Sequence, residues 1–260
     1  MLLLTLLPST NPIGHKLRLC PSASCGWPSP ALDWEETPLS MDELVGVGST
    51  STMLAWVIDD ALYPSGIGVD DLLVIDTALD PTPGDVVLVI YEGEHYLRRL
   101  APRGQPPALF SDVPGIPPLL ISDGQSVEIK GVVTWNLHRH PGAVVPAGLR
   151  DIDVPVRLDE LIKAKACSTY LARASGKSMI DAGIRPGDIL VVDRTCDPQP
   201  GHVVVAIVDG DFTVKRLGGD NGFAQLDPAN PEYTSIALKA EDEPELWGTV
   251  TWNLQRIAQR

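Results

Sequence analysis

A serine and a lysine in the second half of the chain are the residues whose types and setting best suit chemistry. Ser178 lies in the glycine-containing turn Ser175-Gly-Lys-Ser178, and Lys215 follows 37 positions later (215 − 178) in the strand-like run Asp211–Leu217. A serine nucleophile with a lysine as general base is an established variant of the catalytic triad. A lysine acts as base near neutral pH only when its pKa falls well below ~10.4, as burial can achieve. The pair therefore predicts acyl-transfer chemistry that needs no metal and no organic cofactor.

The turn before the serine also predicts a place for the charge that develops during acyl transfer. Gly176 lets the chain bend sharply, so the backbone N–H groups of Lys177 and Ser178 are expected to form an oxyanion hole. The alternative is an ordinary turn serine and a solvated strand lysine. The pattern around both residues favours the catalytic interpretation.

The segment that carries Ser178 and Lys215 occurs twice in the chain. The matching pieces keep one offset of 117 positions, for example 155 − 38 and 248 − 131. The pairs are Pro38–Leu44 with Pro155–Leu161, Ser51–Ala55 with Ser168–Ala172, Leu72–Asp76 with Ile189–Asp193, Asp80–Gly84 with Asp197–Gly201, and Gly131–Leu137 with Gly248–Leu254. About 24 of the 63 positions from Pro38 to Leu100 are identical to their partners, which indicates a tandem duplication.

The first copy lacks both candidate catalytic residues. Ala61 stands at the position of Ser178 (178 − 117), and Arg98 stands at the position of Lys215 (215 − 117). Alanine offers no nucleophile, and arginine keeps its proton in proteins and cannot act as a base. The first copy is therefore expected to be inactive, with Arg98 paired to a carboxylate such as Asp59 or Asp60.

Short β-branched runs between turn signals predict a mainly β fold. The expected strands are Leu72–Asp76, Val86–Tyr91, His95–Leu100 and Val132–Leu137 in the first copy, and Ile189–Asp193, Val203–Val208, Phe212–Leu217 and Thr249–Leu254 in the second. Short helical turns are expected at Met41–Leu44 and Leu158–Leu161. The pair Asp209-Gly210 predicts a hairpin that sets Lys215 on its return strand.

These elements divide the chain into four parts. Residues 1–37 are rich in proline and serine, show no helix or strand periodicity, and are predicted to form an extended arm. Residues 38–140 form the inactive module, residues 141–154 a linker, and residues 155–260 the active module. Two covalently joined copies predict a single-chain pseudo-dimer, since the linker turns association into an intramolecular step.

The bulk composition limits the possible functions. The net charge of −14 argues against a protein whose main task is to bind DNA phosphates, whereas an acidic surface suits basic protein partners. The four cysteines, Cys20, Cys25, Cys167 and Cys196, have no metal-binding spacing and favour reduced thiols. The apolar start Met1–Leu7 is too short for a signal peptide or a membrane span. A cytoplasmic protein without membrane contact is therefore expected.

The stretch Ala174-Ser-Gly-Lys-Ser-Met-Ile-Asp-Ala-Gly-Ile184, followed by Phe212-Thr-Val-Lys-Arg-Leu217, resembles the S24 peptidase family of LexA, UmuD and phage repressor C-terminal domains. The resemblance extends from about residue 20 to the end and includes both copies. It implies a nucleophilic Ser178, a general base Lys215, and two tandem LexA/signal-peptidase-like β-modules. A signal peptidase would share this chemistry but would need a membrane anchor.

The arm contains a segment that resembles a self-cleavage site. Cys25-Gly-Trp-Pro-Ser-Pro-Ala-Leu-Asp33 is similar to the segment of UmuD in which a Cys–Gly bond is cut, which implies cleavage between Cys25 and Gly26. Two other bonds remain candidates. Gly142–Ala143 holds the equivalent position before Ser178, and Ala147–Gly148 resembles the bond cut in LexA-type repressors. Cys25–Gly26 ranks first because its neighbours match best, although the arm must then cross from the first copy to the second.

The resemblance implies a UmuD-like, self-cleaving serine endopeptidase of the SOS DNA-damage response that supports error-prone translesion DNA synthesis after trimming. It implies a RecA–nucleoprotein filament as activator and a Y-family DNA polymerase subunit as partner. One alternative is a LexA- or phage-type transcriptional regulator, but the arm is too short and too proline-rich for a helix-turn-helix. Sequence-specific DNA binding is therefore not expected. The other alternative is a non-cleaving pseudo-dimer scaffold.

Overall fold

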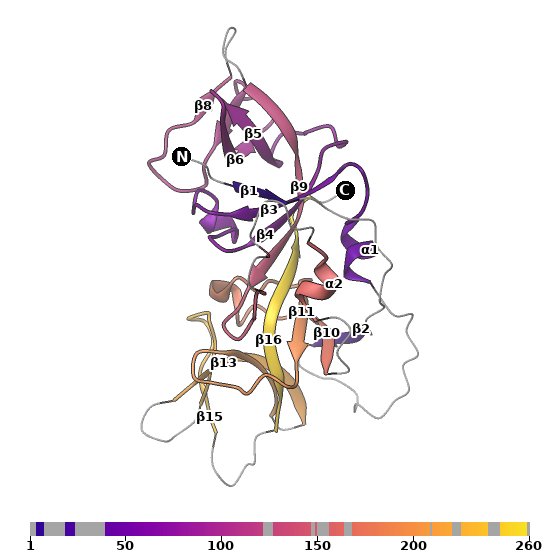
Figure 1. Ribbon diagram of the computed structural model, residues 1–260. Coiled ribbons are helices and arrows are strands. Elements are labelled where there is room, and N and C mark those ends of the chain that lie inside the picture. The colour runs from indigo at the N-terminus through magenta and orange to yellow at the C-terminus, as the bar shows by residue number, and fades with distance from the viewer. Residues whose placement is uncertain are drawn as a thin grey trace.

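The computed structural model describes residues 4–7, 19–23, 40–121, 127–146, 149, 156–163, 168–208, 210–219, 225–238 and 245–258. Within these ranges the chain is mainly β, and its strands join one hydrogen-bonded network. Figure 1 shows two lobes, one above the other, with the long strands β9 and β16 meeting between them. The predicted mainly β pseudo-dimer of two tandem modules is confirmed. No helix in these ranges has the length and apolar character needed to cross a membrane.

The two modules contain the same elements in the same order. The first has α1 (Met41–Val45), β3 (Thr52–Val57), the 3-10 turn η1 (Tyr63–Ser65), β4 (Leu72–Asp76), β5 (Val86–Tyr91), β6 (Glu94–Leu100), β7 (Ala108–Phe110), β8 (Leu119–Leu120) and β9 (Val127–Arg139). The second has α2 (Leu158–Leu161), β10 (Thr169–Ala174), the 3-10 turn η2 (Ile180–Ala182), β11 (Ile189–Asp193), β12 (Val203–Val208), β13 (Asp211–Gly218), β14 (Gln225–Asp227), β15 (Ile236–Ala237) and β16 (Glu245–Arg256). Most pairs keep the offset of 117 at both ends, as in 169 − 52 and 174 − 57 for β10 and β3.

The predicted strands are present, and the predicted hairpin joins β12 to β13, with Val208 opposite Asp211. β4, β5, β11 and β12 have the expected bounds, whereas β9 and β16 are much longer than expected. They are longer because one end of each pairs within its own module and the other end pairs across the interface.

The modules meet around a pseudo-twofold axis. β9 and β16 pair antiparallel, with Leu137 directly opposite Leu254, its equivalent in the second module (254 − 137 = 117). On either side, Asn136 faces Gln255 and His138 faces Asn253, so each contact is repeated with the modules exchanged. This is the isologous contact of a twofold dimer, formed here within one chain.

One hydrophobic core crosses this interface. Trp56 and Leu137 of the first module pack in the same cluster as Trp252 and Leu254 of the second. Ala143, in the predicted linker, is buried in that cluster. Each module also has a core of its own beneath its sheet. The two modules therefore stabilise each other by burying apolar side chains in one common core.

The two short helices cap each other across the same interface. Asp159 in α2 accepts hydrogen bonds from Ser40 Oγ (2.9 Å) and from the backbone N–H of Met41 (2.8 Å) at the start of α1. Asp42 in α1 accepts one from the backbone N–H of Leu158 (2.8 Å) at the start of α2. Helices this short are unstable alone, so each depends on a carboxylate supplied by the other module.

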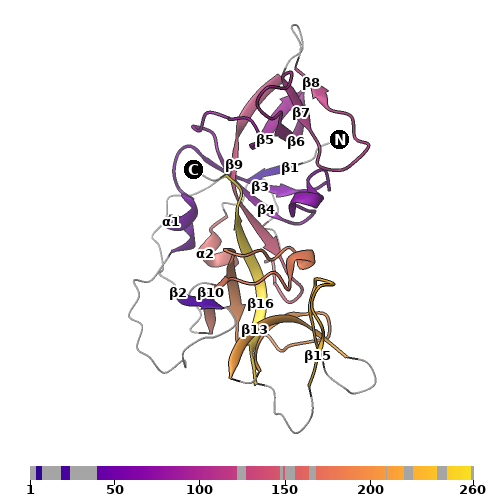
Figure 2. The ribbon, with the colours of Figure 1, turned by 180° about the vertical axis from the view of Figure 1, so that it is seen from behind.

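Two stretches of the arm, residues 1–37, are strands that its sequence pattern did not predict. β1 (Leu4–Leu7) pairs antiparallel with β3 of the first module, and β2 (Leu19–Ala23) pairs parallel with β10 of the second. Figure 2 shows β1 in the upper lobe and β2 in the lower one. Side-chain periodicity does not reveal such strands, because they add to an existing sheet edge through backbone hydrogen bonds.

Candidate active site

Ser178 lies in the turn between β10 and η2. The carbonyl of Lys177 accepts a hydrogen bond from the backbone N–H of Ile180 (3.3 Å), which closes the turn beneath the serine. The N–H of Asp181 donates to the carbonyl of Ala229 (2.8 Å), so a second loop holds η2 from outside. Gly183 ends η2 with φ +77, a conformation that glycine adopts without strain. These contacts fix the backbone that carries Ser178.

Lys215 lies in β13, opposite Val204 of β12. Only 7 % of its surface is exposed. Its Nζ lies 2.9 Å from Ser178 Oγ, 2.9 Å from Thr213 Oγ1 and 3.0 Å from the carbonyl of Val214. Alternation along a strand puts residues 213 and 215 on the same face, which explains why the threonine reaches the amine. The structure thus brings the two predicted site residues into hydrogen-bond contact.

This arrangement has the geometry of a nucleophile and its base. Burial of an amine disfavours its charged form, and a neutral Lys215 Nζ at 2.9 Å can accept the proton of Ser178 Oγ. Thr213 Oγ1 and the Val214 carbonyl hold the amine in place while it exchanges that proton.

Asn230 is a site residue that the sequence interpretation missed. Its Nδ2 donates to the carbonyl of Lys177 at 2.9 Å, and its side chain is largely buried. In a trans peptide the N–H points away from the carbonyl, so fixing the Lys177 carbonyl also fixes the N–H of Ser178. Among the described residues, none accepts a hydrogen bond from the N–H of Lys177 or Ser178. Both groups are thus available where the oxyanion hole is expected.

A comparison of the two copies could have found Asn230. Its equivalent in the first module is Val113 (230 − 117), which cannot make the same hydrogen bond. This is the same kind of difference as Ser178 against Ala61 and Lys215 against Arg98.

The equivalent site in the first module is filled by other contacts. Arg98 is 7 % exposed, its Nη1 donates to the carbonyl of Leu97 (2.7 Å), and its guanidinium lies 5.1 Å from the ring centre of Tyr96. Burial lowers the pKa of Arg98, and the negative charge of Asp59 opposes that shift. Ala61, at the position equivalent to Ser178, is buried and has no reactive group. The site therefore contains a cation and no nucleophile.

The candidate scissile bonds are placed differently. Cys25–Gly26 and Ala147–Gly148 lie outside the described residues. Gly142–Ala143 lies in the turn after β9, where the N–H of Ala143 donates to the carbonyl of His140 (3.1 Å) and Ala143 is buried. β2 runs parallel to β10, with Ala23 opposite Ala174, four positions before Ser178 (178 − 174). The second strand of the arm, β2, therefore lies beside the strand that leads to the serine.

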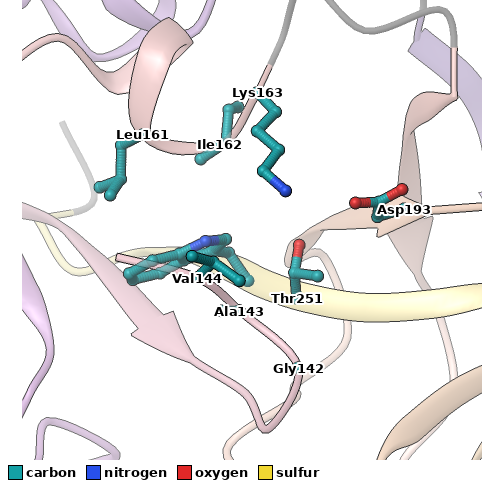
Figure 3. A pocket seen from close by; sticks show the side chains of 9 residues that line it. Gly142, Ala143, Val144, Leu161, Ile162, Lys163, Asp193 and Thr251 are labelled. Atoms are coloured by element: carbon teal, nitrogen blue, oxygen red, sulfur yellow. The ribbon is translucent and has the colours of Figure 1, made fainter. Parts of the chain in front are cut away.

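A small pocket lies apart from the serine and lysine, where the linker, α2 and β16 meet. Figure 3 shows the side chain of Lys163 extended toward Thr251 and Asp193 at its wall. Neither Ser178 nor Lys215 lines it, so it is not part of the candidate active site. Within the described ranges, no group of three or more His, Cys, Asp or Glu side chains is placed to hold a metal ion.

Comparison with known proteins shows partial similarity to several relatives. The LexA repressor of Methylococcus capsulatus is 45 % identical over 75 residues, which are 29 % of this chain and 37 % of that protein. Protein ImpA of Salmonella typhimurium is 54 % identical over 54 residues, which are 21 % of this chain and 37 % of that protein. The LexA repressor of Bordetella pertussis is 43 % identical over 79 residues, which are 30 % of this chain and 37 % of that protein. Each match thus spans less than half of the relative.

The family comparison extends over most of the chain. The model of the family described as "Peptidase S24-like" matches residues 18–134 and matches again at residues 145–251. One match spans the first module with part of the arm, and the other spans the second module. Together with the LexA and ImpA relatives, this double match shows that the chain belongs to the Peptidase S24-like family.

Proposed function

We propose that the chain is a self-cleaving serine endopeptidase in which the second module cuts the arm between Cys25 and Gly26. The observation that carries this proposal is the 2.9 Å contact between Nζ of the buried Lys215 and Oγ of the half-buried Ser178. Membership of a peptidase family supports the same chemistry. In the first module Ala61 and Arg98 leave no nucleophile and no base, so activity is assigned to the second module alone.

The proposed reaction uses groups of this chain only. Neutral Lys215 takes the proton of Ser178 Oγ, and the oxygen attacks the carbonyl carbon of Cys25. The N–H groups of Lys177 and Ser178 bind the oxyanion of the tetrahedral intermediate. As the intermediate collapses, the C–N bond breaks and Lys215 returns the proton to the departing amine of Gly26. Water, deprotonated by the same lysine, then hydrolyses the ester.

The course of the arm supports Cys25–Gly26 as the bond that is cut. β2 ends at Ala23, two positions before Cys25 (25 − 23), and lies along β10 of the active module. Gly142–Ala143 is a weaker substrate, because a buried turn would have to open before it could enter the site. We retain residues 1–37, 38–140, 141–154 and 155–260 as the proposed arm, inactive module, linker and active module.

The biological role extends this proposal by likeness to relatives. LexA repressors and ImpA are among the similar proteins, and the arm segment at Cys25 resembles the cleavage segment of UmuD. We therefore propose a cytoplasmic, UmuD-like role in the SOS response. A RecA–nucleoprotein filament would promote cleavage, and the trimmed protein would support translesion synthesis with a Y-family polymerase subunit.

The test follows cleavage of the purified full chain by intact mass at about pH 10, where a much larger share of lysine is neutral than at about pH 7. The native sequence should yield fragments 1–25 and 26–260. Ser178→Ala should lower the rate by at least ~10³-fold, and Lys215→Arg, which copies the first module, should do the same. Ala61→Ser is the matched control and should leave the rate unchanged.

Each other outcome rejects part of the proposal. Cleavage that persists in Ser178→Ala would rule out the nucleophile, and fragments of other masses would rule out the bond. A native chain that stays intact both at this pH and with a RecA filament would favour a non-cleaving scaffold.

A further inference from the structure

The inactive module binds a piece of the arm in the same place as the active one. β1 lies on β3, and β2 lies on β10, and these two edge strands are equivalent (169 − 52 = 117). β1 also lies close to β6, the strand of Arg98, and β2 lies close to β13, the strand of Lys215. Each arm segment therefore occupies the same sheet edge of its module. Only the direction differs, antiparallel on the first module and parallel on the second.

The backbone of β3 has one side available for an added strand. The N–H of Val57 donates to the carbonyl of Asp71, and the carbonyl of Val57 accepts from the N–H of Asp70. Because backbone groups alternate along a strand, those of Leu54 and Trp56 point to the opposite side. That side is occupied by β1, with Leu7 opposite Leu54 and Thr5 opposite Trp56. Residues 4–7 thus complete an edge that would otherwise be open.

The residues next to this edge of the first module allow binding without cutting. At the positions of the nucleophile and the base stand Ala61 and Arg98, both buried and neither able to attack a peptide bond. A segment held against β3 and β6 is therefore not cut there. The equivalent segment on β10 lies next to a serine and a lysine in contact.

We propose that the first module is a peptide-binding module that holds the chain's own N-terminal segment, Leu4–Leu7, as an added strand. Its ligand class is a short, extended, apolar peptide, and recognition comes from the backbone of Leu54 and Trp56. If the arm is cut at Cys25–Gly26, a step that rests on the proposed function, fragment 1–25 carries both β1 and β2 and stays bound to the rest.

The spacing of the two strands makes this retention effective. β1 ends at Leu7 and β2 begins at Leu19, 12 positions later (19 − 7), so the tether can reach up to roughly 40 Å. When one strand detaches, the other strand keeps it near its sheet edge at high effective concentration. The fragment leaves only when both strands are free together. Trimming and release of the fragment are therefore separate events.

The first experiment tests strand binding in the full-length Ser178→Ala protein, which the proposed dyad cannot cut. Thr5→Pro removes an N–H that faces Trp56, whereas Leu6→Pro removes an N–H that faces away from β3. Hydrogen exchange at Leu54 and Trp56 should become at least ~10-fold faster in Thr5→Pro and change much less in Leu6→Pro. Equal exchange in both variants, or no change in either, would overturn the binding of residues 4–7.

The second experiment tests retention in the processed native chain. Fragment 1–25 should elute with residues 26–260 on size exclusion, and Thr5→Pro should release it while Leu6→Pro should not. A fragment that leaves the native protein at once would overturn retention. If no fragment ever forms, the proposed cleavage fails, but the exchange experiment still decides whether the first module binds Leu4–Leu7.

Discussion

Asn230 shows at the residue scale how the site positions its serine. Its Nδ2 holds the carbonyl of Lys177 at 2.9 Å, and its Oδ1 accepts the N–H of Glu232 at 2.9 Å. The side chain therefore joins two loops, and neither of its two hydrogen bonds goes to Lys215. Its effect on catalysis is to orient the peptide that carries the N–H of Ser178. Asn230 is thus a positioning residue of the oxyanion hole.

Asn230→Val should slow self-cleavage by about 10- to 100-fold, since one hydrogen bond to a reacting geometry contributes roughly 1–3 kcal/mol. The pH at which the rate is half-maximal should stay unchanged, because Lys215 keeps its contacts. The measurement is cleavage rate against pH, by intact mass. Val113→Asn, the reverse change in the inactive module, is the control and should have no effect.

Two results would contradict this role for Asn230. A shifted pH midpoint would mean that the residue acts on the lysine, and an unchanged rate would mean that the Lys177 peptide is held without it. The slower cleavage must also be observed under conditions in which thermal unfolding shows that the variant is still folded.

Ser178 and Lys215 could be predicted because each stands in a specific motif and their chemistry requires contact. Asn230 could not be predicted from one copy, because its loop, Pro228-Ala-Asn-Pro231, is an ordinary turn sequence. Only the comparison with Val113, its equivalent in the first module, marks Asn230 as a candidate site residue. The sequence also predicted an arm that crosses to the second module, but not the strands through which it binds.

At the element scale, the predictable strands are those with a clear pattern of their own. β4 and β11 are apolar runs bounded by turn signals, so their bounds were predicted correctly. β3 was missed because nearly all of its residues are buried, which removes the alternation of a half-exposed strand. β1 and β2 were missed because their partners lie far along the chain and their pairing depends on backbone groups.

The reciprocal caps of α1 and α2 place two acidic groups inside the interface. Burial, with a smaller contribution from the charge of Asp159, raises the pKa of Asp42 to about 6, although the hydrogen bond from the N–H of Leu158 opposes this shift. Between about pH 4 and pH 6 the folded chain binds a proton at Asp42 that the unfolded chain does not. Stability from this group is therefore lost as pH rises through that window.

Asp42→Asn should remove this pH dependence, since its amide oxygen can still accept the N–H of Leu158. The free energy of unfolding should rise by about 1–3 kcal/mol at about pH 7 and change little at about pH 4. Urea unfolding at both values measures it. Glu43→Gln, the same charge change at an exposed position of α1, should have little effect at either pH.

A loss of stability in Asp42→Asn at about pH 7 would contradict this interpretation. It would mean that the attraction between Asp42 and Arg157, whose Nε lies 3.9 Å from Oδ2, outweighs the burial of the charge.

At the scale of the whole molecule, a buried polar network joins the modules beside the pseudo-twofold axis. His140 Nε2 donates to Asn253 Oδ1 across the interface (2.8 Å), and Asn253 Nδ2 donates to Asp188 Oδ2 (2.9 Å). The network is not symmetric, because Ile257 stands at the position equivalent to His140 (140 + 117). The linked modules could therefore diverge at their contact, as they did at their active sites.

His140 makes the interface sensitive to acid. Burial, together with the charges of His138 and Arg216, lowers the pKa of His140 to about 3, against the opposing effect of the hydrogen bond to Asn253. As pH falls below about 6.5, His140 becomes protonated in the unfolded chain but stays neutral in the folded chain. The free energy of unfolding therefore falls by up to ~1.4 kcal/mol per pH unit. Burial raises the pKa of Asp188 to about 6, which acts in the opposite direction over the upper part of the same range.

His140→Gln should separate these effects, because glutamine can donate to Asn253 Oδ1 but does not titrate. At about pH 7 the variant should be less stable by about 1–2 kcal/mol through imperfect packing, and the difference should shrink or reverse by about pH 4.

Urea unfolding across this range measures the effect, and each curve should show one transition, since the modules share a core. A constant difference at every pH would exclude His140 as the acid-sensitive group. Two separate transitions in the native chain would show that the interface does not couple the modules, and the pH effect would then belong to one of them alone.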